Sequence, residues 1–410
     1  MSQGLPSLET GRTAALVSAP RTRLHAVGFA VATALYWFAV YTYVPILSPY
    51  VEHLGAKVWF VGLVIGSYGF TQMLLRVPLG IWSDRTGRRK AFILAGIACA
   101  TASSLGFALT NTPGWALVWR GLAGCAAAGW VAFTVLYASY YRPDEAAKAM
   151  GVISFFTSIG QMAAMTLGGL LAQWKGWHAP FWAGALGGAV GLLVALGIRE
   201  NRDAKRQPVP VAELLRMGTQ WGLLSVSLLA VVSQSITFTT MYGFTNLQAA
   251  HIGASKAMLS LLTLMTSLPN AIAGYVSGGW FVRRFGARAT IITGFLLAAF
   301  GTLAVPLSPW LWLLILTQVV NGFGQGLVMP VLMSLSIHSV HPDRRATAMG
   351  FFQAIYSIGM CGGPFISGWL GQALGLAGVF VFCGITCVFG AWLTWRWVQG
   401  AASPAGPSAQ

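Results

Sequence analysis

Gly80-Ile-Trp-Ser-Asp84-Arg85-Thr-Gly87-Arg88-Arg89-Lys90 is the stretch that decides the fold, because it holds one acid, four bases and two glycines in eleven residues. Long apolar runs flank it on both sides, and the whole chain is only 8% charged. So dense a group of charges is costly inside a lipid bilayer. We therefore predict that the chain leaves a membrane here and turns back into it.

The composition of the chain indicates a membrane protein. It has 410 residues, of which 56% are hydrophobic, and its mean hydropathy is +0.68. Soluble domains carry about 25% charged residues, so this chain lacks the polar side chains that a water-facing surface needs. The net charge of +16 would favour nucleic acid as a partner of a soluble protein. The placement of the charges argues against that, and we expect no nucleic-acid partner.

Most basic residues fall in the two tails and in every second connection between apolar runs. This holds for 20 of the 25 lysines and arginines: Arg12, Arg21, Arg23, Arg85, Arg88, Arg89, Lys90, Arg142, Lys148, Arg199, Arg202, Lys205, Arg206, Arg216, Arg283, Arg284, Arg288, Arg344, Arg345 and Arg396. The other connections hold only Lys57, Lys175 and Lys256. Such alternation follows the positive-inside rule. It predicts a multi-pass protein of the cell membrane with both termini in the cytoplasm.

Twelve apolar runs are long enough to cross the bilayer as helices of about 20 residues. They cover residues 25–48, 57–80, 91–110, 115–140, 147–173, 179–198, 219–248, 257–280, 288–307, 310–338, 346–373 and 376–397. We expect an all-α membrane protein, divided into a cytoplasmic tail at 1–24, a six-helix half at 25–198, a cytoplasmic linker at 199–218, a second six-helix half at 219–397 and a cytoplasmic tail at 398–410.

The two halves repeat each other in sequence. A shift of 199 residues places Arg142-Pro-Asp144 on His341-Pro-Asp343 and Ser158-Ile-Gly160 on Ser357-Ile-Gly359. The same shift places Asp84 on Arg283, so the repeat of the first stretch has lost its acid. Two six-helix pseudo-repeats in the same orientation are typical of transporters with a central cavity near the bilayer midplane.

Three motifs make the chain resemble transporters of the major facilitator superfamily over nearly its whole length. Gly80 to Lys90 is similar to the family's loop motif Gly-x-x-x-Asp-Arg-x-Gly-Arg-Arg. Arg120-x-x-x-Gly124 is similar to the embedded-arginine motif of the drug exporters, with Ala123 in place of the motif's glutamine. Residues 160–169 are similar to the exporters' fifth-span signature but lack its proline, which the eleventh span retains as Pro364.

The resemblance implies a gate on the cytoplasmic side. Asp84 would dock on the start of the eleventh span when this gate is shut, and Arg88 would meet Asp144. Gly80 and Gly87 permit close approach and a tight turn, and Arg85 belongs to the same group. Asp144 and its repeat Asp343 each stand just before an apolar run, so they also suit helix N-caps. The two roles are compatible.

Two arginines lie inside predicted spans, where an ionised side chain is costly. Arg120 lies one to two turns from the outer end of the fourth span. It either extends to the outer interface or bonds to carbonyl groups, or else it faces the cavity as an anion-binding or proton-relay group. Arg76 lies near the inner surface, and we expect its side chain to extend to that surface. Of the nine acids none lies at mid-membrane, and Glu52, at the outer end of the first span, lies nearest.

The middles of several spans offer candidate cavity residues of amide and aromatic type. They are Tyr36, Trp37, Gln161, Gln234, Asn270, Asn321, Gln325, Gln353 and Tyr356. Embedded amides also serve as hydrogen-bonding links between helices, and embedded aromatic residues also serve as packing. As a set with no acid, these residues suit a neutral, amphipathic or weakly anionic solute better than a cation.

These patterns favour a secondary active transporter that works by alternating access, most simply exporting a small amphipathic compound. Uptake or exchange of an organic anion or sugar-like solute is the alternative, and a non-transporting membrane sensor is a third. The sequence has no phosphate-binding Gly-x-x-x-x-Gly-Lys-Ser/Thr loop and no set of nucleophile and base, so we expect no enzyme, cofactor or metal. Proton coupling through Glu52, uncoupled transport and anion exchange all remain open. The expected partners are a small-molecule substrate and the lipid bilayer, and we expect a monomer.

Overall fold

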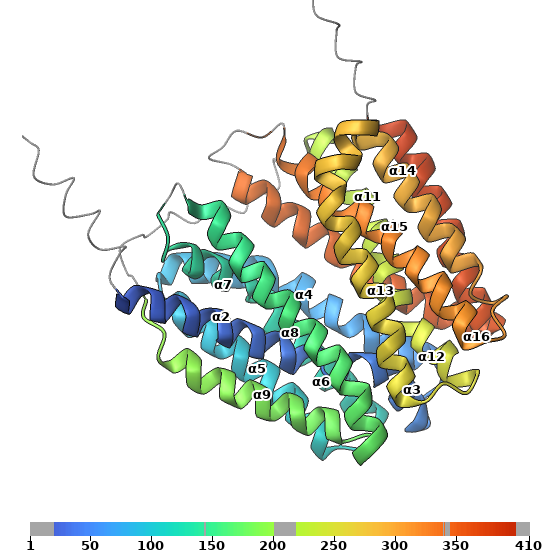
Figure 1. Ribbon diagram of the computed structural model, residues 1–410, viewed down its shortest axis with the longest axis horizontal. Coiled ribbons are helices and arrows are strands. Elements are labelled where there is room, and N and C mark those ends of the chain that lie inside the picture. Colours follow the sequence, from blue (N-terminus) through green and yellow to red (C-terminus); the bar gives the residue numbers. More distant parts are fainter. Residues whose placement is uncertain (1–19, 143–144, 201–218, 339, 341–344, 399–410) are drawn as a thin grey trace, which may run out of the picture.

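The computed structural model describes residues 20–142, 145–200, 219–338, 340 and 345–398. Within these residues the regular structure is entirely helical. Figure 1 shows two bundles of helices side by side, one formed by the blue to green first half of the chain and the other by the yellow to red second half. The expected all-α membrane fold is therefore confirmed at this level. The two tails and most of the linker lie outside the described residues.

The helices of the first half follow the predicted apolar runs closely. They are α2 Pro20–Tyr41, α3 Val44–His53, α4 Val58–Thr86, α5 Arg89–Leu109, α6 Pro113–Ala128, α7 Trp130–Ala138, α8 Ala146–Lys175 and α9 Ala179–Leu196. Two predicted spans are broken, since α2 ends and α3 begins around Thr42 and Gly129 separates α6 from α7. Prolines at the first turns of α6 and α9 suit those helix starts, where a missing backbone N–H costs nothing.

The second half contains longer and less regular helices. They are α11 Trp221–Thr239, the π-helix η2 Thr240–Phe244, α12 Thr245–His251, α13 Lys256–Val276, the π-helix η3 Ser277–Phe281, α14 Val282–Leu303, α15 Leu311–His338 and α16 Arg345–Trp397. Gly286 inside α14 and Gly375 inside α16 have non-helical backbone angles, with φ of 80° and 74°. Glycine tolerates such left-handed values at little cost, so the helix can be interrupted at these two residues.

Ten segments of the described residues are long and apolar enough to cross a membrane. Two of them are far longer than one crossing needs, with 48 residues at Lys256–Leu303 and 51 at Thr347–Trp397. These two contain the breaks at Gly286 and Gly375. The chain is a multi-pass membrane protein.

The charged stretch at 80–90 is less of a loop than its sequence indicates. Helix α4 continues to Thr86, so most of the stretch is helical, and α5 begins again at Arg89. The turn itself occupies Gly87 and Arg88, and Gly87 ends α4 in the left-handed conformation with a φ of 62°. Gly80 has open space around it, since a Cβ there would meet nothing within 4 Å. Of the two glycines in this stretch, therefore, only Gly87 has a backbone conformation that favours glycine.

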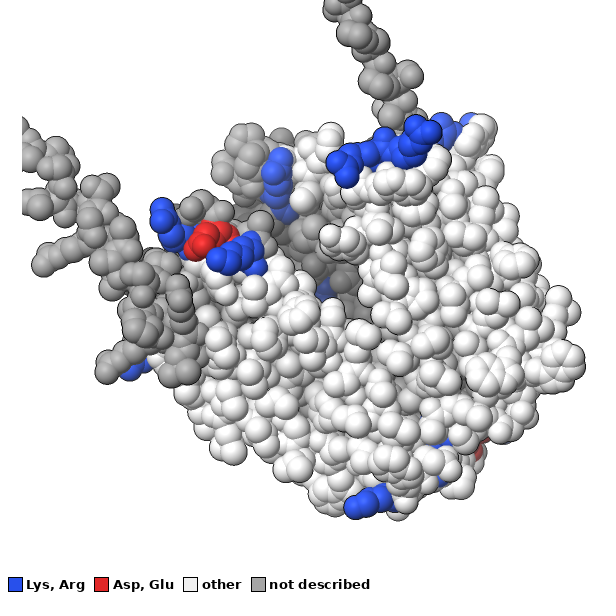
Figure 2. Space-filling model, viewed as in Figure 1, with Lys and Arg blue, Asp and Glu red and all other residues white. Residues whose placement is uncertain are grey.

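The two ends of the molecule differ in charge. The end that carries residues 85–90, 142, 145–148, 199, 283–288, 345 and 396 holds most of the basic side chains that the structure describes, and we name it the basic end. Figure 2 shows these side chains in blue along the upper face, together with a hollow between the two bundles that opens on that face. The opposite end holds Glu52, Lys57, Lys175 and Lys256.

At the opposite end the two bundles share one apolar core. Tyr50 and Val61 of the first half pack in the same cluster of buried side chains as Leu247, Leu259 and Val379 of the second half. The other two large clusters are dominated by one half each. The halves are thus joined at the opposite end and separated by the hollow at the basic end.

Candidate functional site

Backbones of the two halves touch where they meet at the opposite end. A Cβ on Gly62 of α4 would lie 2.3 Å from the Pro364 carbonyl oxygen and 2.8 Å from Gly368 Cα in α16. A Cβ on Gly169 of α8 would lie 2.3 Å from the Lys256 carbonyl oxygen in α13. Such contacts exist only because glycine has no side chain. Gly169 and Gly368 are also equivalent under the 199-residue shift, so each half presents the same surface to the other.

Hydrogen bonds add to this seal, by which we mean the contacts between the halves at the opposite end. The Ser48 hydroxyl donates to the Gly243 carbonyl oxygen at 2.7 Å. The Gly169 N–H donates to Ser260 Oγ at 2.8 Å, and the Ser260 hydroxyl donates to the Met165 carbonyl oxygen. The seal therefore has directional contacts as well as apolar packing.

Glu52 and His251 form an ion pair across the seal. His251 Nε2 lies 2.9 Å from Glu52 Oε2, and the two side chains are 45% and 32% exposed. Sequence reasoning singled out Glu52 but missed His251. The signal was available, because the two residues are 199 positions apart and hence equivalent in the repeat. Equivalent positions of two symmetric halves meet where the pseudo-two-fold axis passes through their interface.

The prediction that the Arg76 side chain extends to the inner membrane surface is wrong. It is buried, with 6% of its surface exposed. Its Nη1 donates to Gln353 Oε1 at 2.7 Å and to the Tyr356 hydroxyl at 3.1 Å. Both partners belong to α16, so Arg76 links the halves from α4. Gln353 and Tyr356 were predicted to line the cavity, and the structure brings them together around an arginine.

Arg120 is more deeply buried, at 2% exposed, which excludes the extended conformation among its predicted alternatives. Its guanidinium carbon lies 4.5 Å from the centre of the Tyr68 ring and 5.7 Å from that of the Tyr43 ring. Nη1 makes one long hydrogen bond to the Tyr43 hydroxyl at 3.4 Å. Arg120 is thus held mainly by aromatic faces, through cation–π attraction.

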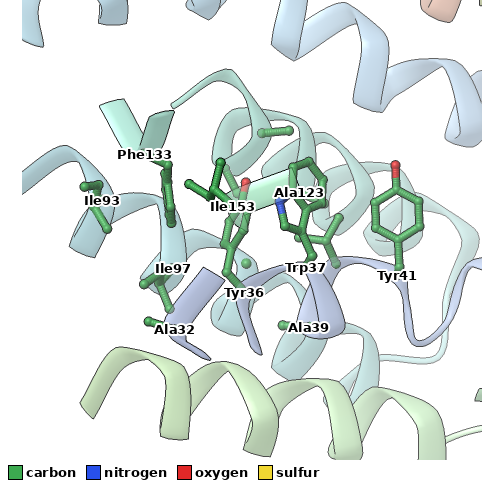
Figure 3. Close-up of a cluster of buried hydrophobic side chains, with 14 of the residues drawn as sticks. Ala32, Tyr36, Trp37, Ala39, Tyr41, Ile93, Ile97, Ala123, Phe133 and Ile153 are labelled. Atoms are coloured by element: carbon green, nitrogen blue, oxygen red, sulfur yellow. The ribbon is translucent and has the colours of Figure 1, made fainter. Parts of the chain in front are cut away.

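Buried aromatic side chains of α2 and α4 accompany the two arginines, and two of them contact the second half. Tyr36, Trp37 and Tyr41 follow one another along α2, and Figure 3 shows them projecting to the same side of that helix. Tyr41 contacts Tyr242 with ring centres 5.8 Å apart, and Tyr68 stacks on Phe238 at 5.8 Å. These two ring pairs join α2 and α4 to the second half. Tyr36 and Trp37 are packed into the first half, as their alternative role as packing residues predicts.

The other predicted amides divide into two groups. Gln325 accepts hydrogen bonds from Ser233 and Thr237 at 3.0 and 3.3 Å, and Asn321 donates to Thr240 at 3.1 Å. These two therefore link α15 to α11 and η2, which is the alternative role of embedded amides. Gln161, Gln234 and Asn270 are half-buried in α8, α11 and α13.

The predicted gate at the basic end is described only in part. Arg85 and Arg88 are exposed. Asp144, Asp343 and the side chain of Asp84 lie outside what the structure describes. The docking of Asp84 on the eleventh span therefore stays a prediction.

A family model decides the assignment of this chain. The model described as "Major Facilitator Superfamily" matches residues 29–250 and 228–410, and these ranges together cover nearly the whole sequence. The chain belongs to the major facilitator superfamily. The resemblance drawn from residues 80–90, 120–124 and 160–169 is thereby confirmed.

Individual superfamily members support this assignment. The inner membrane transport protein YajR of Escherichia coli is 25% identical over 374 residues, covering 88% of this chain and 80% of its own. The class C tetracycline resistance protein of Escherichia coli is 26% identical over 322 residues, covering 74% of this chain and 78% of its own. Both relatives align over most of their own length at low sequence identity. They therefore support membrane transport as the function and do not identify the transported compound.

Solved structures share the fold. A bacterial homologue of the human lysosomal transporter Spinster, in an inward-facing and occupied conformation, has a TM-score of 0.77 at 18% identity and covers 95% of this chain and 100% of its own. The human organic anion transporter MFSD10 has a TM-score of 0.65 at 18% identity and covers 92% of this chain and 100% of its own. At such identity the likeness concerns the fold alone.

Proposed function

We propose that this protein is a twelve-helix secondary transporter that exports a small amphipathic compound by alternating access, with its basic end in the cytoplasm. The observation that carries the proposal is the asymmetry between the two ends. The halves are sealed at the opposite end and separated by a hollow at the basic end (Figure 2). A molecule that rocks between this state and its reverse exposes the same central residues to each side of the membrane in turn.

Several contacts support a pair of equivalent six-helix halves. Gly286 and Gly375 break the two longest of the ten membrane segments, and these breaks support the proposal of twelve crossings. The repeat-equivalent residues Gly160 and Gly359 both pack on the first long helix of their own half, against the Ala34 carbonyl oxygen in α2 and the Val231 carbonyl oxygen in α11. Equivalent residues thus make equivalent contacts within each half.

The ion pair at the seal offers a direct test of alternating access. We expect that a Glu52→Cys/His251→Cys variant, joined by a short bifunctional thiol reagent, cannot open the opposite end and stops exporting. Both side chains are partly exposed and 2.9 Å apart, so a short bridge spans them. The variant is made in a background without the five native cysteines, which are free thiols. Export is measured as lowered accumulation, in expressing cells, of members of a panel of neutral and anionic amphipathic compounds.

A reducible bridge supplies the control for this experiment. Export should return after reduction of the bridge, and a monofunctional reagent on the same cysteines should leave export intact. A cysteine in place of Tyr242, which contacts Tyr41 across the halves, should react with an impermeant maleimide from either side of the membrane. Reaction from the basic end alone, with no compound exported, would favour a sensor over a transporter.

Uptake or exchange of an organic anion is the second candidate. The observation that favours it is the presence of two buried arginines: Arg76, which bonds to the second half, and Arg120, which lies over Tyr68. Names of similar proteins point both ways, since one relative confers tetracycline resistance and one structural neighbour is an organic anion transporter. Assays in vesicles of known orientation distinguish export from uptake.

A pH titration tests whether Glu52 carries a coupled proton. The pair with His251 is ionic only while Glu52 is ionised and His251 is protonated, so its strength changes with pH. Other titratable groups around it are His53 and Lys256, which line the same crevice. We expect Glu52→Gln to flatten the dependence of transport rate on pH, because an amide cannot take up or release a proton. An unchanged pH profile in Glu52→Gln would remove Glu52 from coupling, and Glu145→Gln, at the basic end, is the matched control.

A further inference from the structure

We infer that the region between the halves contains an anion-binding site formed by Arg76 and Arg120, and that the transported compound carries an acidic group such as a carboxylate on an aromatic or apolar body. This inference rests on the proposed transport function and specifies the chemistry of its substrate. It concerns recognition only and holds for export as for uptake.

The positive charges of the two buried arginines are not balanced by a described acidic side chain. Arg76 and Arg120 are 6% and 2% exposed. The structure records no ion pair for either of them among the side chains that it describes. Their hydrogen-bond partners are the neutral groups of Gln353, Tyr356 and Tyr43. A buried charge is stable only when it is paired and hydrogen-bonded, so this pair of cations lacks a counter-charge that a substrate can supply.

Both arginines have a hydrogen-bond donor that is left without a partner. Arg76 Nε and Arg120 Nε are both buried without a hydrogen-bond partner. Each of these atoms carries a hydrogen and can only donate. Gln72 Oε1, on the same helix as Arg76, is a buried acceptor that also lacks a partner. A ligand that fits this set must be rich in acceptors, as a carboxylate is.

The two arginines lie at the ends of one row of buried side chains. Tyr68, Gln72 and Arg76 are spaced four residues apart along α4, which places them on one face of that helix, and all three are buried. Arg120 lies over the Tyr68 ring at one end of this row. Eight residues of helix span about 12 Å, so Arg76 and Arg120 flank a stretch about the length of a small aromatic molecule. Gln72, with its unpartnered oxygen, lies between them.

The surroundings of this row suit the rest of such a substrate. Phe238 stacks on Tyr68, and Tyr242 contacts Tyr41. These two ring pairs place aromatic side chains of both halves next to the row, and ring-to-ring packing is favourable when partners are offset or tilted. Because Arg76 already bonds to Gln353 and Tyr356 in the other half, an anion at Arg76 binds at a contact between the two halves. Binding there is therefore coupled to the relative position of the halves.

A matched pair of small probes tests the inference on the purified full chain. The probes are 1-naphthoate and its neutral amide, 1-naphthamide, which differ mainly in charge. We expect the carboxylate to bind at least about tenfold more tightly than the amide, the factor that one charge-assisted hydrogen bond provides. Arg76→Gln and Arg120→Gln should each remove this preference, and Arg396→Gln, which removes an exposed charge at the basic end, should keep it. Binding is measured by thermal shift and by quenching of tryptophan fluorescence.

The outcomes separate this inference from the proposed transport function. Equal binding of both probes, preference for the carboxylate in both arginine variants, or failure of the wild-type protein to bind either probe would overturn the anion site. Neutral compounds exported by cells would still support transport in that case. If a variant fails to fold, Arg76→Lys and Arg120→Lys keep the charge but lose the planar fork that pairs with a carboxylate. They should show a reduced preference, and an undiminished one counts against direct contact.

Discussion

Replacement of Gly62 by leucine should lower the transport rate by about tenfold or more while the protein stays folded. Gly62 lies where α4 crosses α16, and a Cβ there would be 2.3 Å from the Pro364 carbonyl oxygen. The obstacle is backbone, which cannot rotate away as a flexible side chain can. Forcing extra atoms into such a contact costs about 1–3 kcal/mol. Since this contact lies between the halves, the substitution destabilises the state in which the opposite end is sealed relative to the state in which it is open.

The consequence is a shift of population between states. A difference of about 1.4 kcal/mol changes an equilibrium tenfold, so the seal should open in a large share of Gly62→Leu molecules. A transporter that cannot close one end loses its cycle. We expect a cysteine at Tyr242 to react faster with an impermeant reagent added on the opposite side than it does without the Gly62 change. Gly62→Ala should give a smaller effect in the same direction.

Gly362 provides the matched control for this prediction. It lies in α16 near the same crossing, but a Cβ on it would meet nothing within 4 Å. Gly362→Ala should transport normally, whereas Gly62→Ala should not. Equal rates in these two variants would show that close contact of α4 with α16 is not needed for transport.

The arrangement of helices was predictable from the sequence because it follows from one physical requirement. Every backbone group in the bilayer must be hydrogen-bonded within the protein, so long apolar runs become helices. The runs beginning at 57, 91 and 179 correspond closely to α4, α5 and α9. The breaks at Thr42 and Gly129 and the π-helical turns η2 and η3 were not predicted. They adjust each helix to its neighbours and have no signal in the apolar pattern.

The candidate site was predicted less well, because its residues act in pairs that the sequence does not show. Arg76 was assigned to the membrane surface on the evidence of α4 alone. Its partners Gln353 and Tyr356 are 277 and 280 residues away. Asn321 and Gln325 look like cavity residues in sequence, but each uses one polar atom of its amide to bond to the second half. Only the repeat carried information over such distances, and it pairs Glu52 with His251.

The same repeat leads to the second large effect, on stability. Gly160→Val and Gly359→Val should each destabilise the protein by about 1–3 kcal/mol or more, the usual cost of overpacking. A Cβ on Gly160 would lie 2.3 Å from the Ala34 carbonyl oxygen, and one on Gly359 would lie 2.1 Å from the Val231 carbonyl oxygen. Both contacts lie within a half. They should therefore lower the midpoint of thermal unfolding by several degrees, where Gly62→Leu mainly shifts the balance between states.

Gly151 and Gly350 make this comparison internally controlled. They lie on the same helices, α8 and α16, and are again 199 residues apart, but a Cβ on either would meet nothing within 4 Å. Gly151→Ala and Gly350→Ala should be neutral or slightly stabilising, because alanine favours helix by up to about 1 kcal/mol over glycine. Thermal unfolding of the purified variants measures all four changes. If the two packed glycines differ widely in cost, the halves are not equivalent in packing, and the symmetric rocking that the transport proposal assumes loses its structural basis.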